Sequence, residues 1–174
     1  MAAKQATSVI PIMFVVGDPV GTGLVVSRAR PGGNVTGLSV QVADLAGKRL
    51  EILREVVPGL SRVAVMGNAG NPLTVVELGE VQRAARTLGL EVITSEIRRG
   101  EDIAPAFEAL NGRADALYVC IDPLVGTHRI RINTLAVAAR QPPMHASREY
   151  AEAGGLMSYG PKRAGPVPAC WRPC

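Results

Sequence analysis

Three apolar runs of the chain each end at an Asp or Asn, and a proline follows closely each time. The stretches read FVVGDPV at 14–20, VAVMGNAGNP at 63–72 and VCIDPL at 119–124, with Asp18, Asn68, Asn71 and Asp122 as their polar residues. A carboxylate or amide at such a place can hold the ammonium or hydroxyl group of a small ligand. The same residue types often cap the helix or turn that follows. The pattern therefore leaves two interpretations open, a ligand site and a set of caps.

Residue types that support catalysis or metal binding are sparse. The glycine-rich stretch GDPVGTG at 17–23 lacks the Lys-Ser/Thr of a P-loop and the spacing of a dinucleotide-binding motif. Neither His128 nor His145 has an evident Ser or Cys nucleophile as a partner in the sequence. Cys170 and Cys174 are separated by three residues without a nearby His, which is a weak zinc signal. We predict no catalytic residue, no metal ligand and no cofactor.

The elements that would position these residues alternate between strand and helix. Apolar runs predict strands at 10–16, 35–40, 62–66, 91–97, 116–121 and 144–147. Apolar residues at helical spacing lie between the later strands, as in Leu78, Val81, Ala85 and Leu88 before Gly89, and another helix is expected after a cap at Asp102. This alternation predicts an α/β fold with a doubly wound parallel sheet. Ligands of such sheets bind beyond the carboxyl ends of the strands, where the polar residues above are expected.

Composition narrows the classes of function. Hydrophobic residues make up 47% of the chain and charged residues 20%, which allows a sizeable core. Aromatic residues make up only 3%, too few to provide stacking platforms for single-stranded nucleic acid. The net charge is +4, but basic pairs such as Lys48/Arg49 interleave with acids such as Glu77, so we assign them to solvated faces and predict no nucleic-acid partner.

Several longer strings together resemble one protein family. They are IPIMFVVGDPVGTGLV, RPGGNVTGLSV, LAGKRLEILREVVPGLSRVAVMGN, QRAARTLGLEV and REYAEAGGLMSYGP, and they cover about residues 3–161. They are similar to substrate-binding proteins of a bacterial ABC-transporter family whose better-understood relatives take up aromatic amino acids. The resemblance implies a type I periplasmic binding protein, in which two lobes close around a small solute and present it to permease subunits in the membrane. It also implies a periplasmic location and no catalysis.

The resemblance assigns roles to residues of this sequence. It makes Asp122 the carboxylate that receives a ligand ammonium group and Asn68 the polar residue that orients the ligand from the neighbouring strand end. Asp18 becomes a candidate from the other lobe. Ser39 and Tyr159 fall close to the crossings between lobes and are further candidates for ligand binding.

The chain also departs from the family pattern. Family members begin with a secretion signal and most of the first lobe, whereas no signal peptide is evident here and residues 3–16 are similar to the last portion of that lobe. We therefore expect a remnant of the first lobe and a hinge crossing at 1–43, a complete second lobe at 44–148 and a return crossing at 149–161. The tail KRAGPVPACWRPC at 162–174 is expected to be unstructured and out of frame. Such a truncated member would bind poorly, and its exposed strand edges would favour association.

Two other classes remain open from the residues alone. A ligand-sensing domain of a transcription regulator shares the type I fold, but it normally carries an N-terminal helix-turn-helix, for which residues 1–8 are too few. A small α/β enzyme could use Asp122 as an acid or base, but it would need a second converging polar group that the sequence does not indicate.

Overall fold

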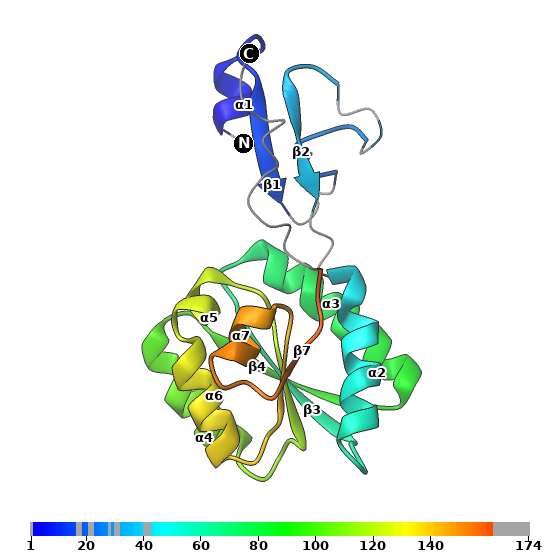
Figure 1. The fold of residues 1–174 in the computed structure, drawn as a ribbon, viewed down its shortest axis with the longest axis vertical. Coiled ribbons are helices and arrows are strands. Elements are labelled where there is room, and N and C mark those ends of the chain that lie inside the picture. Colours follow the sequence, from blue (N-terminus) through cyan, green and yellow to red (C-terminus); the bar gives the residue numbers. More distant parts are fainter. Residues whose placement is uncertain are drawn as a thin grey trace.

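The structure is a computed structural model, and it describes residues 2–16, 19, 20, 23–27, 29, 32–39 and 43–161. The expected tail at 162–174 lies outside the described residues. A short helix, α1 (Ala2–Ala6), precedes β1 (Ile12–Val16), which pairs in parallel with β2 (Val35–Ser39). All other strands belong to a second sheet (Figure 1).

The second sheet has five parallel strands in the order β4-β3-β5-β6-β7. They are β3 (Arg62–Asn68), β4 (Glu91–Ile97), β5 (Ala116–Val119), β6 (Pro143–His145) and β7 (Met157–Ser158). The chain moves outward from β3 to β4 and then returns to the other side of β3 with β5. The carboxyl ends of β3 and β5 therefore meet at a topological switch point, the place where ligands of such sheets bind.

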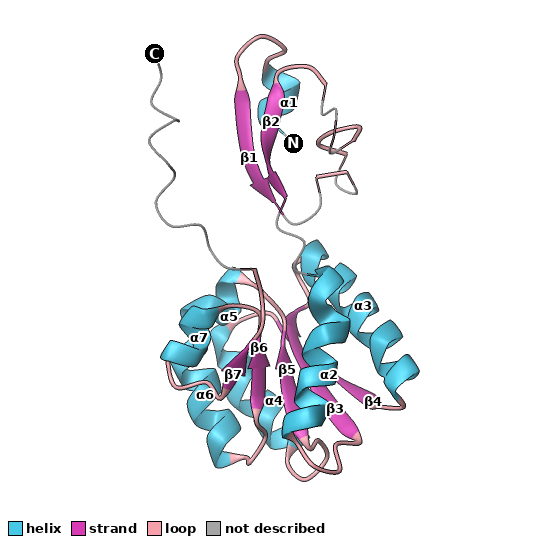
Figure 2. Cartoon of the chain, turned by 45° about the vertical axis from the view of Figure 1, so that its right-hand side comes forward, coloured by secondary structure: helices cyan, strands magenta, loops and turns pink. Residues whose placement is uncertain are grey.

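Helices cover both faces of this sheet, as Figure 2 shows. They are η1 (Ala43–Leu45), α2 (Ala46–Val56), α3 (Pro72–Leu88), η2 (Gly100–Asp102), α4 (Ile103–Leu110), α5 (Pro123–Thr127), α6 (Arg129–Ala138) and α7 (Arg148–Glu152). In Figure 1, α2 and α3 lie on one side of the sheet and α4 and α6 on the other. The predicted doubly wound α/β fold is confirmed.

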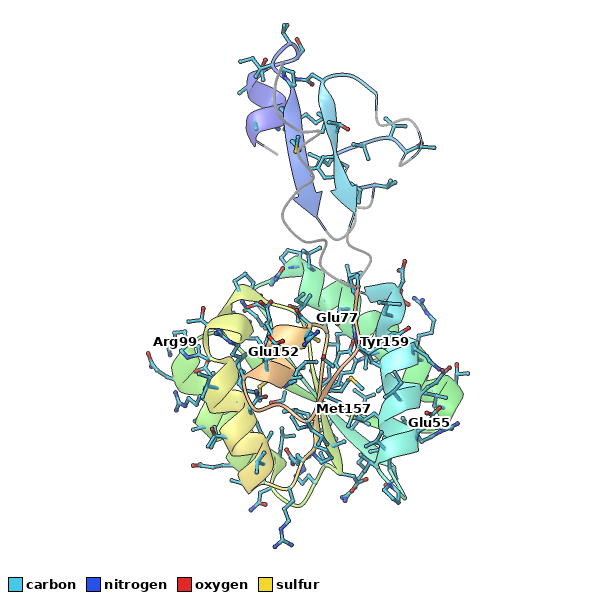
Figure 3. The ribbon with its side chains drawn as sticks, in the orientation of Figure 1. Glu55, Glu77, Arg99, Glu152, Met157 and Tyr159 are labelled. Carbon is cyan, nitrogen blue, oxygen red and sulfur yellow. The ribbon has the colours of Figure 1, made fainter. Side chains whose placement is uncertain are left out.

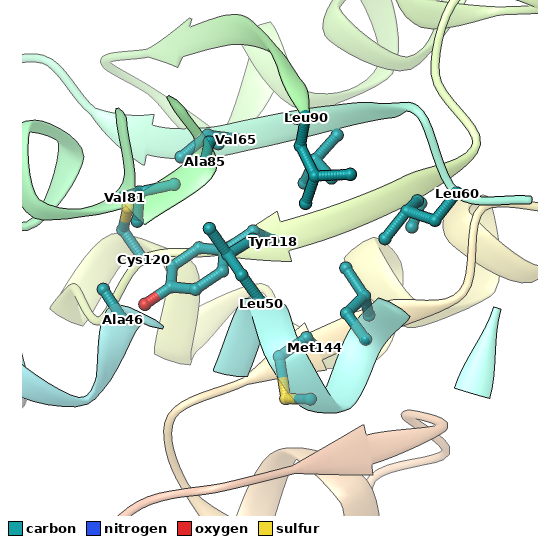
Figure 4. Packing of buried hydrophobic residues seen from close by; sticks show 13 residues of the cluster. Ala46, Leu50, Leu60, Val65, Val81, Ala85, Leu90, Tyr118, Cys120 and Met144 are labelled. Carbon is teal, nitrogen blue, oxygen red and sulfur yellow. The ribbon is translucent and has the colours of Figure 1, made fainter. Parts of the chain in front are cut away.

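The core has two layers because successive strand residues point to opposite faces. In β3, Val63 and Val65 join the layer under α2 and α3, whereas Ala64 and Met66 join the layer under α4 and α6. The first layer is drawn in Figure 4, where the ring of Tyr118 lies among aliphatic side chains. Both layers are largely aliphatic, as the low aromatic content predicts.

The ends of α3 follow from its sequence. Pro72 stands at the first helical position, where its missing N–H costs no hydrogen bond, and the Asn71 side chain caps the helix by accepting from Leu73 N at 3.0 Å. Gly89 ends the helix with φ of 70°, a left-handed conformation that glycine adopts without a steric penalty. The prediction that the Asp102 side chain caps α4 is wrong. Its carboxylate accepts from Arg98 N and Arg99 N, which precede it, and makes no cap bond to α4.

The later strands lie close to their predicted positions. The prediction for β4 matches at both ends, whereas β3 ends two residues later than expected, at Asn68, and β6 covers Pro143–His145 rather than 144–147. β5 ends at Val119, two residues earlier than expected, so that Cys120 and Ile121 lead to Asp122 outside the strand. The sheet also gains a fifth strand, β7, which pairs with β6 in the segment 149–161. That segment was expected to act as a crossing between lobes, and β7 is too short to have shown a period-2 pattern.

The unit formed by α1, β1 and β2 leaves apolar side chains in contact with solvent, among them Met13 of β1 and Val9 and Ile10 in the segment before it. Association through this unit stays a prediction. Within the described part of the chain, no helix has both the length and the apolar character that crossing a membrane would require.

One carboxylate secures the amino-terminal end of β5. Asp115 accepts four hydrogen bonds, from Ser61 N, Ser61 Oγ, Arg62 N and Arg62 Nη2, at 2.8–3.1 Å. The Arg62 guanidinium, assisted by the Ser61 and Arg62 amides, holds the pKa of this carboxyl well below its usual range.

We expect Asp115→Asn to lower the free energy of unfolding by about 1–2 kcal/mol, because the amide can accept only part of this set. Urea denaturation at neutral pH measures the loss. The depressed pKa means that the contribution is present above the ordinary Asp range and disappears as the pH falls below it. A variant as stable as the wild type at pH 7 would contradict this role.

Candidate functional site

The carboxyl end of β3 carries two asparagines. Asn68 is the last residue of β3, and its Oδ1 accepts from Gly70 N at 2.9 Å, which turns the chain toward α3. Asn71 follows three residues later as the cap of α3. Gly67 allows α3 to start this close to the strand, since a Cβ at that position would collide with the Thr74 side chain.

Asp122 lies at the adjacent strand end and collects polar contacts from both asparagines. It is 4% exposed. Its Oδ1 accepts from Leu124 N at 2.7 Å, which caps α5, and its Oδ2 accepts from Asn71 Nδ2 at 2.7 Å. Asn68 Nδ2 lies 3.2 Å from both carboxylate oxygens. We call Asn68, Asn71 and Asp122 the strand-end cluster.

The strand-end cluster combines the two interpretations that the sequence left open. Asn71 and Asp122 are helix caps, and they also converge on one another at the switch point of the sheet. A buried carboxylate held by amide donors is oriented before any ligand arrives, so a cationic group could bind it without rearranging the backbone. The sequence pattern included Asn71 among the polar residues at the strand ends, but the family resemblance assigned it no role in ligand binding.

The other candidate residues are not part of this cluster. Asp18 lies outside the described residues. Ser39 is the last residue of β2, where its backbone is paired with Val16; the structure does not describe its side chain. Tyr159 contacts β6 and α2 through its backbone. Its N–H donates to His145 O at 2.9 Å, and its carbonyl accepts from Arg49 Nε at 2.7 Å. Their roles in ligand binding stay predictions.

A buried polar network lies next to the cluster, and sequence reasoning missed it. Arg49 Nη1 lies 3.1 Å from Glu77 Oε1, and the two side chains are 0% and 3% exposed. The Tyr118 hydroxyl accepts from Arg49 Nη1 at 2.7 Å and donates to Glu77 Oε1 at 2.8 Å. The assignment of Arg49 and Glu77 to solvated faces was therefore wrong. The signal existed, because Glu77 lies four residues before Val81 and Arg49 three after Ala46, on the apolar stripes of their helices.

Burial shapes the protonation of this network. Burial raises the pKa of the Glu77 carboxyl, while Ile121 N–H, the Tyr118 hydroxyl and Arg49 partly offset the rise. Burial also raises the pKa of Tyr118 well above its ordinary value, and the neighbouring Glu77 carboxylate adds to that rise. The tyrosine therefore stays a neutral donor, which suits its place between the two charges.

Two cavities of the described chain do not coincide with the strand-end cluster. Two hollows, of about 440 Å³ and 200 Å³, both reach Thr94, Ser95 and Glu96 of the edge strand β4. Neither is lined by a member of the cluster. In the described part of the chain, no three His, Cys, Asp or Glu side chains lie close enough together to hold a metal ion.

Comparison with known proteins assigns the chain to a family. The sequence model described as ABC transporter substrate binding protein matches residues 1–164. The chain belongs to the ABC transporter substrate-binding protein family. This agrees with the resemblance drawn from the sequence, and proteins of this family deliver solutes to membrane importers.

Several relatives are similar to this chain over most of the chain's length. A tyrosine-binding protein from Clostridioides difficile is 30% identical over 158 residues, which are 90% of this chain and 45% of the relative. A solved conserved domain protein from Vibrio cholerae is 30% identical with a TM-score of 0.80, over 91% of this chain and 53% of the other. An ABC domain from Streptococcus pneumoniae, solved with L-Trp, shares the fold at 24% identity and a TM-score of 0.77, over 89% and 54% of the two chains. The chain thus spans about half the length of these relatives.

Proposed function

We propose that this chain acts in the solute-binding component of an ABC importer and holds the ammonium group of an amino acid at Asp122. The observation that carries the proposal is the position of the Asp122 carboxylate. It is almost fully buried, it lies at the switch point of the sheet, and it is oriented by amide donors of the β3–α3 connection and by one backbone N–H of its own turn. A carboxylate is the natural partner for an ammonium group.

The contacts of Asp122 suggest how a ligand would enter. Leu124 N and Asn71 Nδ2 make short bonds of 2.7 Å and would remain as supports. Asn68 Nδ2 makes two longer contacts of 3.2 Å, so it is the donor that a ligand ammonium displaces most easily. The released amide could then donate to the carboxylate of the same ligand.

The relatives suggest the class of solute. One is called a tyrosine-binding protein and another was solved with L-Trp, so we propose an aromatic amino acid as the ligand of this chain. The other lobe would contribute Asp18 and Ser39, which lie in residues 1–43. Residues 44–148 would form the second lobe, and residues 149–161, which include Tyr159, would form the return crossing. The partners would be permease subunits, the location periplasmic and the function non-catalytic. A ligand held by residues 44–161 alone would be bound less tightly than one enclosed between two lobes, because a second lobe adds enclosing surface.

The proposal is tested by thermal melting with L-tyrosine, L-tryptophan and 3-(4-hydroxyphenyl)propionate, which is tyrosine without its ammonium group. We expect the amino acids to raise the melting temperature saturably and the propionate to have no effect, because a ligand that binds only the folded state stabilises it. Asp122→Asn keeps an oxygen for the cap and removes the charge, so it should weaken L-tyrosine binding by about tenfold or more.

Asp115→Asn is the matched control. It neutralises a hydrogen-bonded aspartate at the opposite end of β5, and it should leave the L-tyrosine affinity unchanged while it lowers stability. Equal stabilisation by L-tyrosine and by the propionate would rule out recognition of the ammonium group. A cooperative melt that no compound shifts would rule out aromatic amino acids as ligands of this chain.

A further inference from the structure

The buried Arg49–Glu77 pair connects segments that are far apart in the sequence. Arg49 lies in the first turn of α2, Glu77 in α3 and Tyr118 in β5. Each contact in this set has a matching donor and acceptor. Arg49 donates to Tyr118 and to Glu77, and the Tyr118 hydroxyl donates to Glu77. Figure 3 shows Glu77 and Tyr159 at the same end of the five-stranded unit.

Each member of the pair also makes one hydrogen bond to a backbone group, and we call these two bonds the arms of the pair. Arg49 Nε donates to the carbonyl of Tyr159 at 2.7 Å, across 110 residues of sequence. Glu77 Oε2 accepts from the N–H of Ile121 at 3.0 Å, and Ile121 is the residue before Asp122. One ion pair thereby contacts both the turn that presents Asp122 and the segment that leaves the sheet after β7.

Stability alone is a weak reason for such a pair. Taking two charges out of water costs free energy that their attraction only partly restores, and well-packed apolar residues of similar volume often serve equally well. What apolar residues cannot supply is a donor for Tyr159 O and an acceptor for Ile121 N at defined positions. The geometry of the two arms is therefore the property that these charges provide.

We propose that Arg49 and Glu77 are a positioning pair, which fixes the Asp122 turn relative to the segment at Tyr159. Its relevance to ligand binding rests on the proposed function of Asp122, whereas its structural part does not. The pair acts through backbone groups, so neither side chain needs to contact the ligand.

The test replaces the whole network by apolar residues in the variant Arg49→Met/Glu77→Leu/Tyr118→Phe. Residue-resolved amide hydrogen exchange of the full chain is measured at Ile121 and at Tyr159, whose N–H is bonded to His145 O. We expect both amides to exchange about tenfold faster or more, because each loses the side chain that holds its segment. L-tyrosine affinity should fall by a similar factor.

Val81→Ala is the control for a general loss of stability, since it opens a cavity in the same core layer without touching either arm. It should leave the relative protection of the two amides and the L-tyrosine affinity unchanged. Wild-type exchange at Ile121 and Tyr159 in the triple variant, or an equal acceleration in Val81→Ala, would overturn the proposal.

If the triple variant does not fold, the single substitution Arg49→Lys, which keeps the charge, tests whether the pair positions the two segments. Lysine has no equivalent of Nε and cannot form the guanidinium fork, so the Tyr159 amide should exchange faster while the Ile121 amide keeps its protection. Unchanged exchange at Tyr159 overturns the proposal. If the wild-type chain does not respond to L-tyrosine, the proposed function fails, and the exchange measurements still decide the role of the pair.

Discussion

Replacing Glu77 by methionine is expected to lower the free energy of unfolding by about 3–5 kcal/mol, the largest effect of any single change considered for this chain. The substitution removes the carboxylate that pairs with Arg49 at 3.1 Å, and the guanidinium is 0% exposed. Arginine cannot give up its proton in a protein, so the positive charge stays buried after its counter-charge is gone. Ile121 N also loses its acceptor.

The reverse substitution should cost less. In Arg49→Met the remaining carboxyl can take up a proton, and burial already raises the pKa of Glu77 toward that outcome. Urea denaturation of both variants at pH 7 measures the difference. Equal losses would show that the cost comes from lost packing rather than from an unpaired charge. A loss below about 1 kcal/mol for Glu77→Met would mean that the pair contributes no more to stability than a solvent-exposed salt bridge does.

The second large effect is a loss of stability in acid that His145 causes. Its Nε2 lies 2.8 Å from Asn133 Oδ1, and Asn133 Nδ2 is occupied by the carbonyls of Tyr150 and Ala153. The asparagine oxygen therefore accepts, and the neutral ring carries its hydrogen on Nε2. The other nitrogen, Nδ1, is buried without a hydrogen-bond partner in the described chain, and the ring stacks on Tyr150 with centroids 4.9 Å apart. Among the described residues, no acceptor bonds Nδ1 to stabilise a second proton.

Burial lowers the pKa of His145 to about 4 from an ordinary value near 6.5. The unfolded chain therefore binds a proton between these values while the folded chain does not. The contribution of the neutral ring is present above the unfolded pKa and is lost as the pH falls from about 6.5 to about 4, by up to about 3 kcal/mol. The free energy of unfolding, measured by urea denaturation at several pH values in this window, should fall accordingly.

His145→Gln separates this contribution from that of the carboxylates. The glutamine amide can still donate to Asn133 Oδ1 but has no proton to take up, so the variant should lose most of the slope between pH 6.5 and 4. His128→Gln removes the other histidine of the chain and should retain the slope. A His145→Gln variant with the same slope as the wild type would assign the acid sensitivity to other groups.

The repeating elements of the larger sheet could be predicted because they depend on local patterns. The stripe Leu78–Val81–Ala85–Leu88 and the terminating Gly89 lie on one helix, α3, as expected. The predicted strand at 91–97 matches β4 at both ends. Elements of two or three residues, such as β7, are too short for a periodicity and could be recognised only in the assembled sheet.

The candidate site was predictable in part for the same reason. Polar residues at strand ends are visible in a sequence, and both Asn68 and Asp122 could be named in advance. Their convergence depends on β3 and β5 being neighbours, which is a property of strand order and leaves no trace in local periodicity. Tyr159 was placed near a crossing, but its backbone carbonyl rather than its side chain makes the contact with Arg49.

Long sequence strings established the family by resemblance, whereas residue types and their spacing predicted the α/β alternation and the polar character of the strand ends. The tertiary structure alone decided which charges are buried. The sequence places Arg49 and Glu77 on the apolar stripes of their helices, but only the packing of α2 against α3 brings the two charges together, and a buried charge is tolerated only when its partner arrives from another element. It also decided the acid sensitivity of His145, because a pKa depends on the groups that folding brings around the ring.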